Sequence, residues 1–222
     1  MRNTRNCKKK VGPAALLGLC YALAVALWVV SLLVRGGILL THKANGTMRT
    51  LTLQPQELQC ESFVNYEDLA WNEPPEEGEN WYLSTDNDPH LLWNCEDVPL
   101  YLETVRMDAR HDLAPGAVTL YYRTPGQQDF SEAQKIYAAL DREGRYCFDL
   151  GGVTVSALRI DPDSVGGVPT QLHGVELNPP EFWAKKLLPN GGQAILLAFG
   201  PAVAAALFAL LRWLFAPAAK QR

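Results

Sequence analysis

Two charge-free apolar runs constrain this chain more than any other feature of its sequence. Residues 13–34 and 191–211 contain no Asp, Glu, Lys or Arg, and they are 22 and 21 residues long. A helix needs about 20 apolar residues to cross the hydrocarbon core of a bilayer. We therefore predict two transmembrane helices, with short tails over 1–12 and 212–222 and one domain over 44–186 between them.

Each run has a second interpretation. The first could be a cleaved signal peptide, because Lys8, Lys9 and Lys10 precede it. It is longer than the usual apolar signal core of about 7–15 residues, and no small-x-small cleavage site follows it closely. The second could be a buried core helix. Its uninterrupted apolar length favours a membrane span, in which the helix-breaking pair Gly200-Pro201 is tolerated.

Charges beside the two runs predict the topology. Both tails are basic and contain no acidic residue, and the positive-inside rule assigns such flanks to the cytoplasm. Both termini should therefore be cytoplasmic and the central domain extracytoplasmic. Residues 44–190 contain 24 acidic and 10 basic residues, a net charge of −14. Such a surface repels phosphate backbones, which argues against nucleic-acid binding.

Alternating apolar residues predict that the central domain is built from strands. The alternation is visible in segments 48–53, 118–122, 146–148, 153–160 and 175–177, which turn residues separate. Short strands at such spacing are typical of an antiparallel sandwich or barrel. We expect a β-bulge at Ala157-Leu158, where the apolar phase slips. We also expect one short helix from Ser131 to Leu140, with Ser131 as its N-cap.

Several short motifs in this domain resemble a known type of module. They are Tyr121-Tyr122, Phe130-Ser131-Glu132, Leu158-Arg159-Ile160-Asp161-Pro162, the spaced Val175 and Leu177, and Ser84-Thr85-Asp86-Asn87-Asp88-Pro89. Over about residues 80–178, the chain is similar to the extracytoplasmic β-sandwich modules of bacterial cell-surface polysaccharide glycosyltransferases and related membrane proteins. The resemblance implies a jelly-roll-like, carbohydrate-related domain in a bacterial envelope. Because the chain has no recognisable transferase domain, it implies an accessory or binding role and no catalysis.

Motifs for catalysis and metal binding are weak. Asp86-Asn87-Asp88 matches the D-x-D pattern that holds a metal ion in many glycosyltransferases, but nucleotide sugars are cytoplasmic and this segment is predicted outside. An ordinary turn explains the same residues. The four histidines lack metal-ligand spacing, and no serine lies in a nucleophile motif. We therefore predict no metal and no cofactor. We favour a non-enzymatic protein over the alternative, a small envelope enzyme acting on polysaccharide.

Aromatic and polar residues gather between residues 71 and 93. Indole faces can stack on the apolar faces of sugar rings, and carboxylates and amides can hydrogen-bond sugar hydroxyls. The candidate ligand-binding residues are Trp71, Trp81, Asn80, Asp86 and Asp88. We expect a ligand to meet this region rather than the membrane-proximal end of the domain. The alternative is a merely solvated acidic loop over 73–80, with Trp93 and Tyr82 as core aromatics.

Together these features predict a non-catalytic membrane accessory protein of cell-envelope polysaccharide biosynthesis. Its expected partners are membrane lipid, a glycan or lipid-linked glycan, and a membrane glycosyltransferase on which the outer domain docks. The cysteines leave one question open. Cys60 and Cys95 could form a disulfide or remain buried thiols, and the sequence does not decide between these states.

Overall fold

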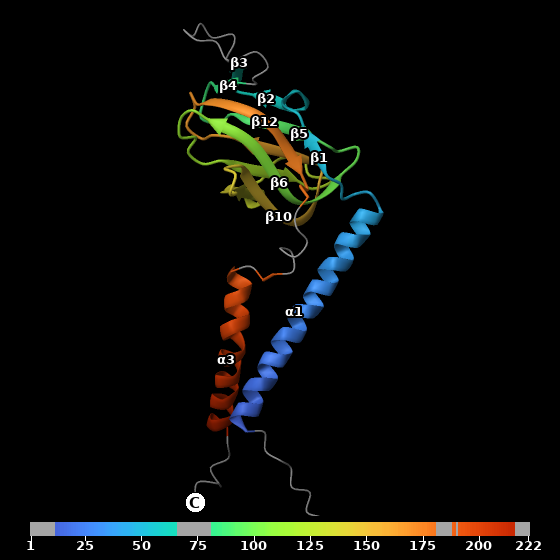
Figure 1. Cartoon of the computed structure of the whole chain (residues 1–222), viewed down its shortest axis with the longest axis vertical. Coiled ribbons are helices and arrows are strands. Elements are labelled where there is room, and N and C mark those ends of the chain that lie inside the picture. Colours follow the sequence, from blue (N-terminus) through green and yellow to red (C-terminus); the bar gives the residue numbers. More distant parts are fainter. Residues whose placement is uncertain (1–11, 66–80, 181–187, 190, 216–222) are drawn as a thin grey trace, which may run out of the picture. The chain divides into compact units, whose positions relative to one another are not determined.

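A computed structural model of the chain describes residues 12–65, 81–180, 188–189 and 191–215 (Figure 1). The chain divides into two compact units. One runs from Leu39 to Pro180 and contains the strands, and the other contains most of the first long helix and all of the last.

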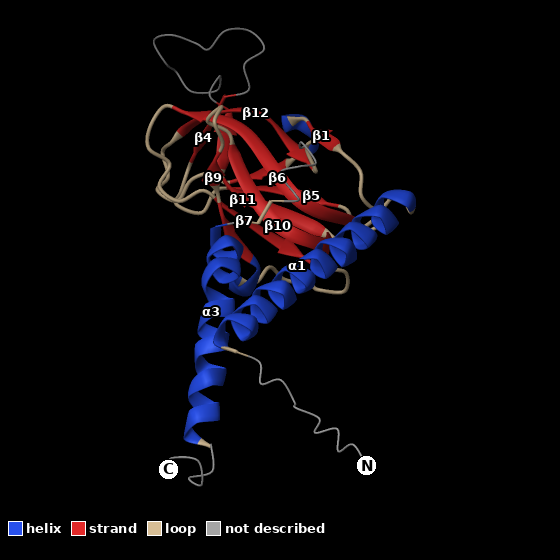
Figure 2. Ribbon diagram, turned by 60° about the horizontal axis from the view of Figure 1, so that its bottom comes forward, coloured by secondary structure: helices blue, strands red, loops and turns tan. Residues whose placement is uncertain are grey.

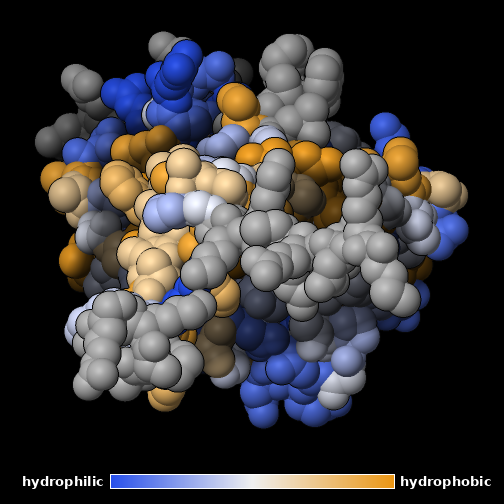
Figure 3. All heavy atoms as spheres, turned by 90° about the horizontal axis from the view of Figure 1, so that it is seen from below, coloured by the Kyte–Doolittle hydropathy of each residue, from blue (hydrophilic) through white to orange (hydrophobic). Residues whose placement is uncertain are grey.

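Two long helices flank the strands: α1 (Pro13–Ala44) and α3 (Gly191–Leu214). Both are long and apolar enough to cross a membrane. No residue of α1 is buried, and large hydrophobic side chains are exposed along both helices. Figure 3, the view from below, shows orange hydrophobic atoms at the surface. The Tyr21 hydroxyl of α1 donates a hydrogen bond to the Ala198 carbonyl oxygen of α3 at 2.7 Å. The first helix continues ten residues beyond the predicted end at Val34.

Short strands and two single turns of 3-10 helix make up the rest of the described chain. The elements are β1 (Leu51–Leu53), η1 (Pro55–Glu57), β2 (Gln59–Glu61), β3 (Phe63–Asn65), β4 (Trp81–Ser84), β5 (His90–Asn94), β6 (Leu100–His111), β7 (Thr119–Arg123), η3 (Glu132–Gln134), β8 (Lys135–Tyr137), β9 (Ala139–Leu140), β10 (Tyr146–Val155), β11 (Ala157–Asp161) and β12 (Pro169–Leu177).

Within the described residues, the strands form two antiparallel sheets. The first has seven strands in the order β3-β4-β12-β6-β10-β9, with β1 also paired to β12; the second has five in the order β2-β5-β11-β7-β8. The chain changes sheet repeatedly, for example between β4 and β5 and between β10 and β11, as it does in jelly rolls. Figure 2 shows these strands in red. The structure confirms the predicted all-β sandwich with two flanking helices of membrane-spanning length.

The core lies between the inner faces of the two sheets. In the five-stranded sheet, Leu91, Ile160 and Leu120 are direct neighbours on three adjacent strands, and all three are buried. In the seven-stranded sheet, Phe148 and Val105 are paired and have no exposed surface. Successive side chains of a strand point to opposite faces, so the residues between these positions reach the outer surfaces.

Two local predictions were wrong. Residues 131–140 form no helix, because Ser131 caps only the single turn η3, where its hydroxyl accepts a hydrogen bond from the Ala133 N–H at 3.3 Å. The chain then enters β8, whose Ile136 pairs with Leu120 of the neighbouring strand. Ala157 and Leu158 pair regularly within β11 and form no bulge; the chain instead crosses from β10 to β11 just before them, at Ser156. The apolar phase slips there because the two strands belong to opposite sheets.

The described cysteines are free thiols. Cys60 lies opposite Leu91, which is four residues before Cys95 along the same strand direction. Four residues of strand span about 13 Å, whereas the Cα atoms of a disulfide lie within about 7 Å of each other. Cys60 and Cys95 are therefore not bridged.

The incoming and outgoing segments of the sandwich lie side by side. Leu51, at the start of β1, pairs with Leu177, at the end of β12. The Thr50 hydroxyl donates to the Asn178 carbonyl oxygen at 2.8 Å, and the Asn178 amide donates to the Arg49 carbonyl oxygen at 3.3 Å. We call this part of the sandwich, marked by Arg49, Thr50 and Asn178, the connector end.

Candidate functional site

The structure separates the predicted ligand-binding residues. Trp71 and Asn80 lie outside the described residues. Trp81 begins β4 and lies opposite Gln171 of β12, which in turn lies opposite Arg110 of β6. Because the next residue, Tyr82, packs against the core, Trp81 is on the outer face of the seven-stranded sheet.

Asp86 and Asp88 lie in the turn between β4 and β5. One carboxylate oxygen of Asp86 accepts a hydrogen bond from the Ser62 hydroxyl at 2.8 Å, and the other accepts from the Asp88 N–H at 2.9 Å. The Asp88 N–H, and after it the Ser62 hydroxyl, hold the pKa of Asp86 below its usual value. Both oxygens of Asp86 therefore serve the turn, which agrees with the turn interpretation of Asp-Asn-Asp-Pro.

Asp88 belongs to a second cluster that could in principle hold a metal ion. Ligand atoms of Asp88, His90 and Asp161 lie within 4.8 Å of one another. However, the Arg159 guanidinium contacts both carboxylates: its Nε donates to Asp161 Oδ1 at 2.7 Å, and its Nη2 donates to Asp88 Oδ1. The His90 ring nitrogens face the Asp88 carbonyl at 2.8 Å and the Glu61 carboxylate at 3.0 Å.

Arg159 therefore provides the positive charge that this cluster needs. Burial raises the pKa of Asp161, and the neighbouring guanidinium opposes that shift. A metal ion would have to displace a guanidinium that already makes hydrogen bonds to both carboxylates, and such charge-assisted bonds are among the strongest in proteins. We assign the cluster a structural role in joining the turn between β4 and β5 to β11.

The outer face of the five-stranded sheet is also internally paired. Lys135 lies over the rings of Tyr121 and Tyr137, at 5.0 and 5.6 Å from their centroids. The Tyr121 hydroxyl donates to the Glu132 carboxylate at 2.9 Å, and Arg159 lies over the same ring at 5.3 Å. These contacts satisfy one another, so the face offers few free polar groups to a ligand.

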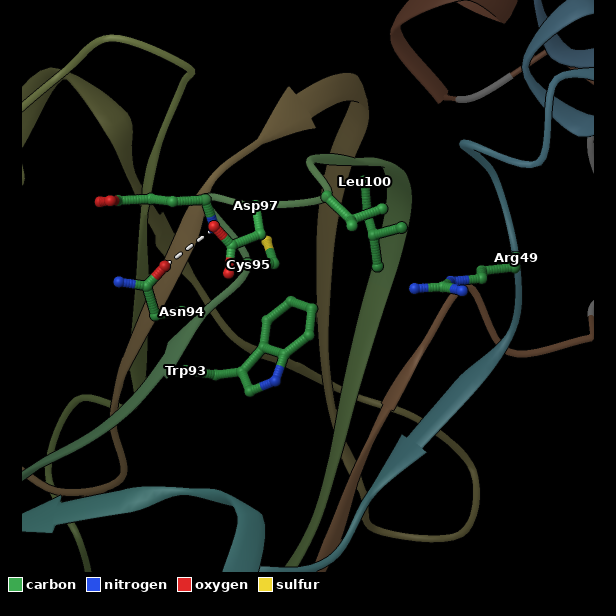
Figure 4. A pocket seen from close by; sticks show the side chains of 8 residues that line it. Arg49, Trp93, Asn94, Cys95, Asp97 and Leu100 are labelled. Carbon is green, nitrogen blue, oxygen red and sulfur yellow. Dashed lines mark hydrogen bonds between the residues drawn. The ribbon is translucent and has the colours of Figure 1, made fainter.

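A pocket at the connector end has a different character (Figure 4). Its volume is about 430 Å³, within the range of small-molecule sites. The residues labelled in Figure 4 are Arg49, Trp93, Asn94, Cys95, Asp97 and Leu100. They come from the segment before β1, the end of β5, and the loop and strand start that follow it. In this view the Trp93 indole lies between Arg49 on one side and Asn94 on the other.

Hydrogen bonds fix the loop that forms one wall of this pocket. The Asn94 side-chain oxygen accepts from the Glu96 N–H at 2.9 Å, and the Cys95 N–H donates to the Ser156 carbonyl at 2.8 Å. The Glu96 carboxylate accepts from Arg123 at 2.8 Å. Glu96 is thereby neutralised by a neighbour. Among the described residues, Arg49 and Asp97 form no ion pair, so both charges remain available at the pocket.

The pocket offers binding groups rather than a nucleophile. Burial raises the pKa of Cys95 to about 11, although the nearby Arg49 charge opposes the shift. The thiol is therefore protonated at neutral pH and unreactive. Trp93 packs one part of its ring against the core and lines the pocket with another. An indole, a guanidinium, an amide and a carboxylate thus line one concavity.

Sequence reasoning missed this pocket. It counted Trp93 in the aromatic region between residues 71 and 93, with a core aromatic as the alternative, and did not select Arg49, Asn94 or Asp97. Arg49 is 44 residues from Trp93 along the chain, and the two line one pocket only when β1 joins the sheet. The only local signal was the sequence Trp93-Asn94, followed closely by the acidic pair Glu96-Asp97.

No family model and no curated protein matches this chain. Solved structures with a similar outline include a low-affinity xylan-binding module, CBM86, from Roseburia intestinalis. The identity is 14%, the TM-score is 0.37, and the match covers 59% of this chain and 95% of that one. A variant of the family 29 carbohydrate-binding module CBM29-2 has 10% identity and a TM-score of 0.38, over 59% of this chain and 91% of that one.

A family 32 module of C. perfringens NanJ, in complex with galactose, has 9% identity and a TM-score of 0.36, over 58% of this chain and 98% of its own. With TM-scores below 0.5, none of these similarities assigns a ligand to this protein. Its own structure defines it as a β-sandwich protein with two flanking apolar helices and an open, polar and aromatic pocket at the connector end.

Proposed function

We propose that this protein is a non-catalytic, membrane-anchored glycan-binding protein with cytoplasmic tails and an extracytoplasmic sandwich. The observation that carries the proposal is the pocket at the connector end, where the Trp93 indole lies among Arg49, Asn94 and Asp97. A sugar ring has apolar C–H faces that an indole can cover. Its hydroxyls can donate to a carboxylate and accept from a guanidinium or an amide.

The arrangement of the connectors supports the membrane part of the proposal. Two membrane spans with both tails on one side require the outer domain to begin and end at the same edge. Thr50 and Asn178, which precede β1 and follow β12, are in direct hydrogen-bond contact at 2.8 Å. The chain can therefore leave the sandwich where it arrives, without crossing the domain.

The outer face of the seven-stranded sheet at Trp81 is proposed as a second contact region, for a longer glycan or for a membrane glycosyltransferase. Asp86 and Asp88 are proposed as a separate contact in the turn between β4 and β5, where their carboxylates are already engaged by Ser62 and Arg159. Trp81→Ala should reduce binding of a long glycan or of a crosslinked protein partner. Unchanged binding by a normally folded variant would remove this region from the proposal.

A binding experiment on the full chain tests the function. The protein in lipid nanodiscs is applied to a glycan array, and the bound glycans are then incubated with it and examined for cleavage. We expect binding without turnover, and Asp97→Ala should weaken it. Asp112→Ala is the matched control, since Asp112 is also exposed but follows the opposite end of β6. Turnover would favour the enzyme alternative, and equal effects of the two variants would place the site elsewhere.

Cysteine labelling on intact cells tests the topology. Val98 is 56% exposed, so Val98→Cys should react with a membrane-impermeant maleimide in a Cys95→Ala background. Cys7, in the first tail, should not react until the cells are permeabilised. The reverse pattern would overturn the proposed orientation.

A further inference from the structure

We propose, building on the glycan-binding function, that the connector-end pocket takes the phosphate-linked sugar of a lipid-linked saccharide, with Arg49 binding the phosphate. Two independent features of the pocket lead to this ligand class. One is its position on the chain relative to α1, and the other is the Arg49 guanidinium in its lining, which forms no ion pair with any residue that the structure describes.

The pocket adjoins the segment by which α1 joins the sandwich. The last turn of α1 belongs to the same compact unit as the strands. The His42 ring of that turn stacks on Tyr101, with centroids 3.9 Å apart and planes 13° apart. The Tyr101 N–H donates to the Thr47 carbonyl at 2.8 Å. Leu100, beside Tyr101, and Arg49, two residues after Thr47, both line the pocket.

The length of α1 sets where the chain leaves the membrane. A helix of 32 residues is about 48 Å long, whereas a bilayer with its headgroups is about 40–45 Å thick. A spanning α1 therefore ends near the outer headgroup surface, and Arg49 follows that end closely along the chain. The ligand that the membrane presents to this part of the chain is the head of a lipid.

The charge of Arg49 selects among lipid heads. Its side chain is exposed and forms no ion pair with any described residue, in a segment that carries a net charge of −14. A neutral sugar does not require an isolated guanidinium, but a phosphate oxygen pair matches its planar fork. Glu96 is held by Arg123, so Asp97 is the remaining carboxylate at the pocket. It is exposed and lines the pocket, so sugar hydroxyls can donate to it.

Trp93 distinguishes a glycosylated lipid from a plain anionic one. An indole in the pocket wall gives nothing to a bare phosphate, but it can cover the apolar face of the sugar attached to that phosphate. In a lipid-linked sugar, the phosphate would meet the Arg49 guanidinium, the sugar ring face would meet the Trp93 indole, and the hydroxyls would meet the Asp97 carboxylate. The volume of about 430 Å³ suits the first sugar and its phosphate rather than a long polymer.

The test uses the full chain in nanodiscs with three probes: a polyprenyl phosphate bearing one hexose, the same polyprenyl phosphate without sugar, and soluble methyl hexoside. Retention of each lipid is measured by native mass spectrometry, and binding of the hexoside by calorimetry. We expect the hexose-bearing lipid to be retained preferentially. Arg49→Gln should weaken its retention by about tenfold to a hundredfold, the range for hydrogen bonds to charged groups. Arg49→Lys should restore part of it.

Arg142→Gln is the matched control, because Arg142 is an exposed arginine in the turn between β9 and β10, at the end of β10 away from Val155, which pairs with Leu100 of the pocket. Retention of the hexose-bearing lipid by this variant should be unchanged. Equal retention of the two lipids, or an Arg49→Gln variant that retains the hexose-bearing lipid normally, would overturn this inference. If methyl hexoside still binds and Asp97→Ala weakens this binding, the proposed glycan function survives even though the phosphate inference fails. If no saccharide binds at all, both proposals fail.

Discussion

Asn178 should be the residue whose loss most weakens the connector end. It is 7% exposed and follows β12 with a φ of +48°. Its side-chain oxygen accepts from the Glu103 N–H at 2.8 Å, and its amide donates to the Tyr101 carbonyl at 2.8 Å. The same amide reaches the Arg49 carbonyl at 3.3 Å. One side chain thus holds the start of β6, the end of β12 and the segment before β1.

The expected cost of Asn178→Ala follows from these contacts. Leaving a buried backbone donor and a buried acceptor without a partner costs about 1–3 kcal/mol each. Holding alanine at a left-handed φ adds about 1 kcal/mol, a conformation that asparagine tolerates better. We expect the free energy of unfolding to fall by about 4 kcal/mol, which corresponds to a melting temperature lower by roughly 10 °C for a unit of this size.

Asn178→Gly separates the two contributions, because glycine adopts the left-handed conformation freely but makes none of the side-chain bonds. It should be about 1 kcal/mol more stable than Asn178→Ala and still well below the original protein. The assay is denaturant unfolding of the full chain in micelles, followed by tryptophan fluorescence, with Asn87→Ala in an exposed turn as the control. A loss below about 1 kcal/mol for Asn178→Ala, or a glycine variant less stable than the alanine variant, would refute the reasoning.

Three further outcomes are expected. Gly152→Ala should lower the free energy of unfolding by about 2–4 kcal/mol, because a Cβ at φ +92° would lie 2.1 Å from the Tyr101 hydroxyl oxygen. The control Gly151→Ala has open space around the added Cβ and should cost only about 1 kcal/mol. Since burial raises the pKa of Cys95 to about 11, its alkylation rate should rise about tenfold per pH unit above neutrality, and a flat profile would contradict this. Burial lowers the pKa of His111. The stability that its neutral ring provides is therefore complete above the unfolded-state pKa of about 6.5 and declines as the pH falls below it. The free energy of unfolding of His111→Gln should decline less at mildly acid pH than that of the original protein.

The architecture could be predicted because its signals are local. A membrane-length helix needs only an uninterrupted apolar run, and a half-buried strand needs only alternation, as at Leu51 and Leu53. The helix expected over 131–140 was wrong because Ile136, Ala139 and Leu140 fit a helical period as well as a strand. Pairing with β7 decided the outcome, and that partner lies more than ten residues away in sequence.

The pocket could not be predicted, because no segment contains it. Trp93 satisfies the pattern of a core aromatic, and its contact with the core agrees with that pattern. Its second role depends on Arg49, which reaches the pocket only after β1 pairs with β12. Conversely, the D-x-D pattern at 86–88 was visible in sequence, yet its carboxylates are engaged by Ser62 and Arg159. Neither engagement can be seen before the strands assemble.

The hydrogen bond from the Asn178 amide to the Arg49 carbonyl links the connector end to the pocket, so the coupling between Asn178 and the pocket can be measured. The Asn178 amide bonds the carbonyl of Arg49, the residue proposed to bind phosphate. Asn178→Gly should therefore loosen the backbone of Arg49 and weaken retention of the hexose-bearing lipid, without touching Trp93 or Asp97. If the effect acts through Arg49, combining it with Arg49→Gln should add little to the loss from Arg49→Gln alone, because residues that act through one contact are not additive. Fully additive losses in this double-mutant cycle would show that Asn178 supports the site by another route, and would leave Arg49 without the positioning that its proposed role requires.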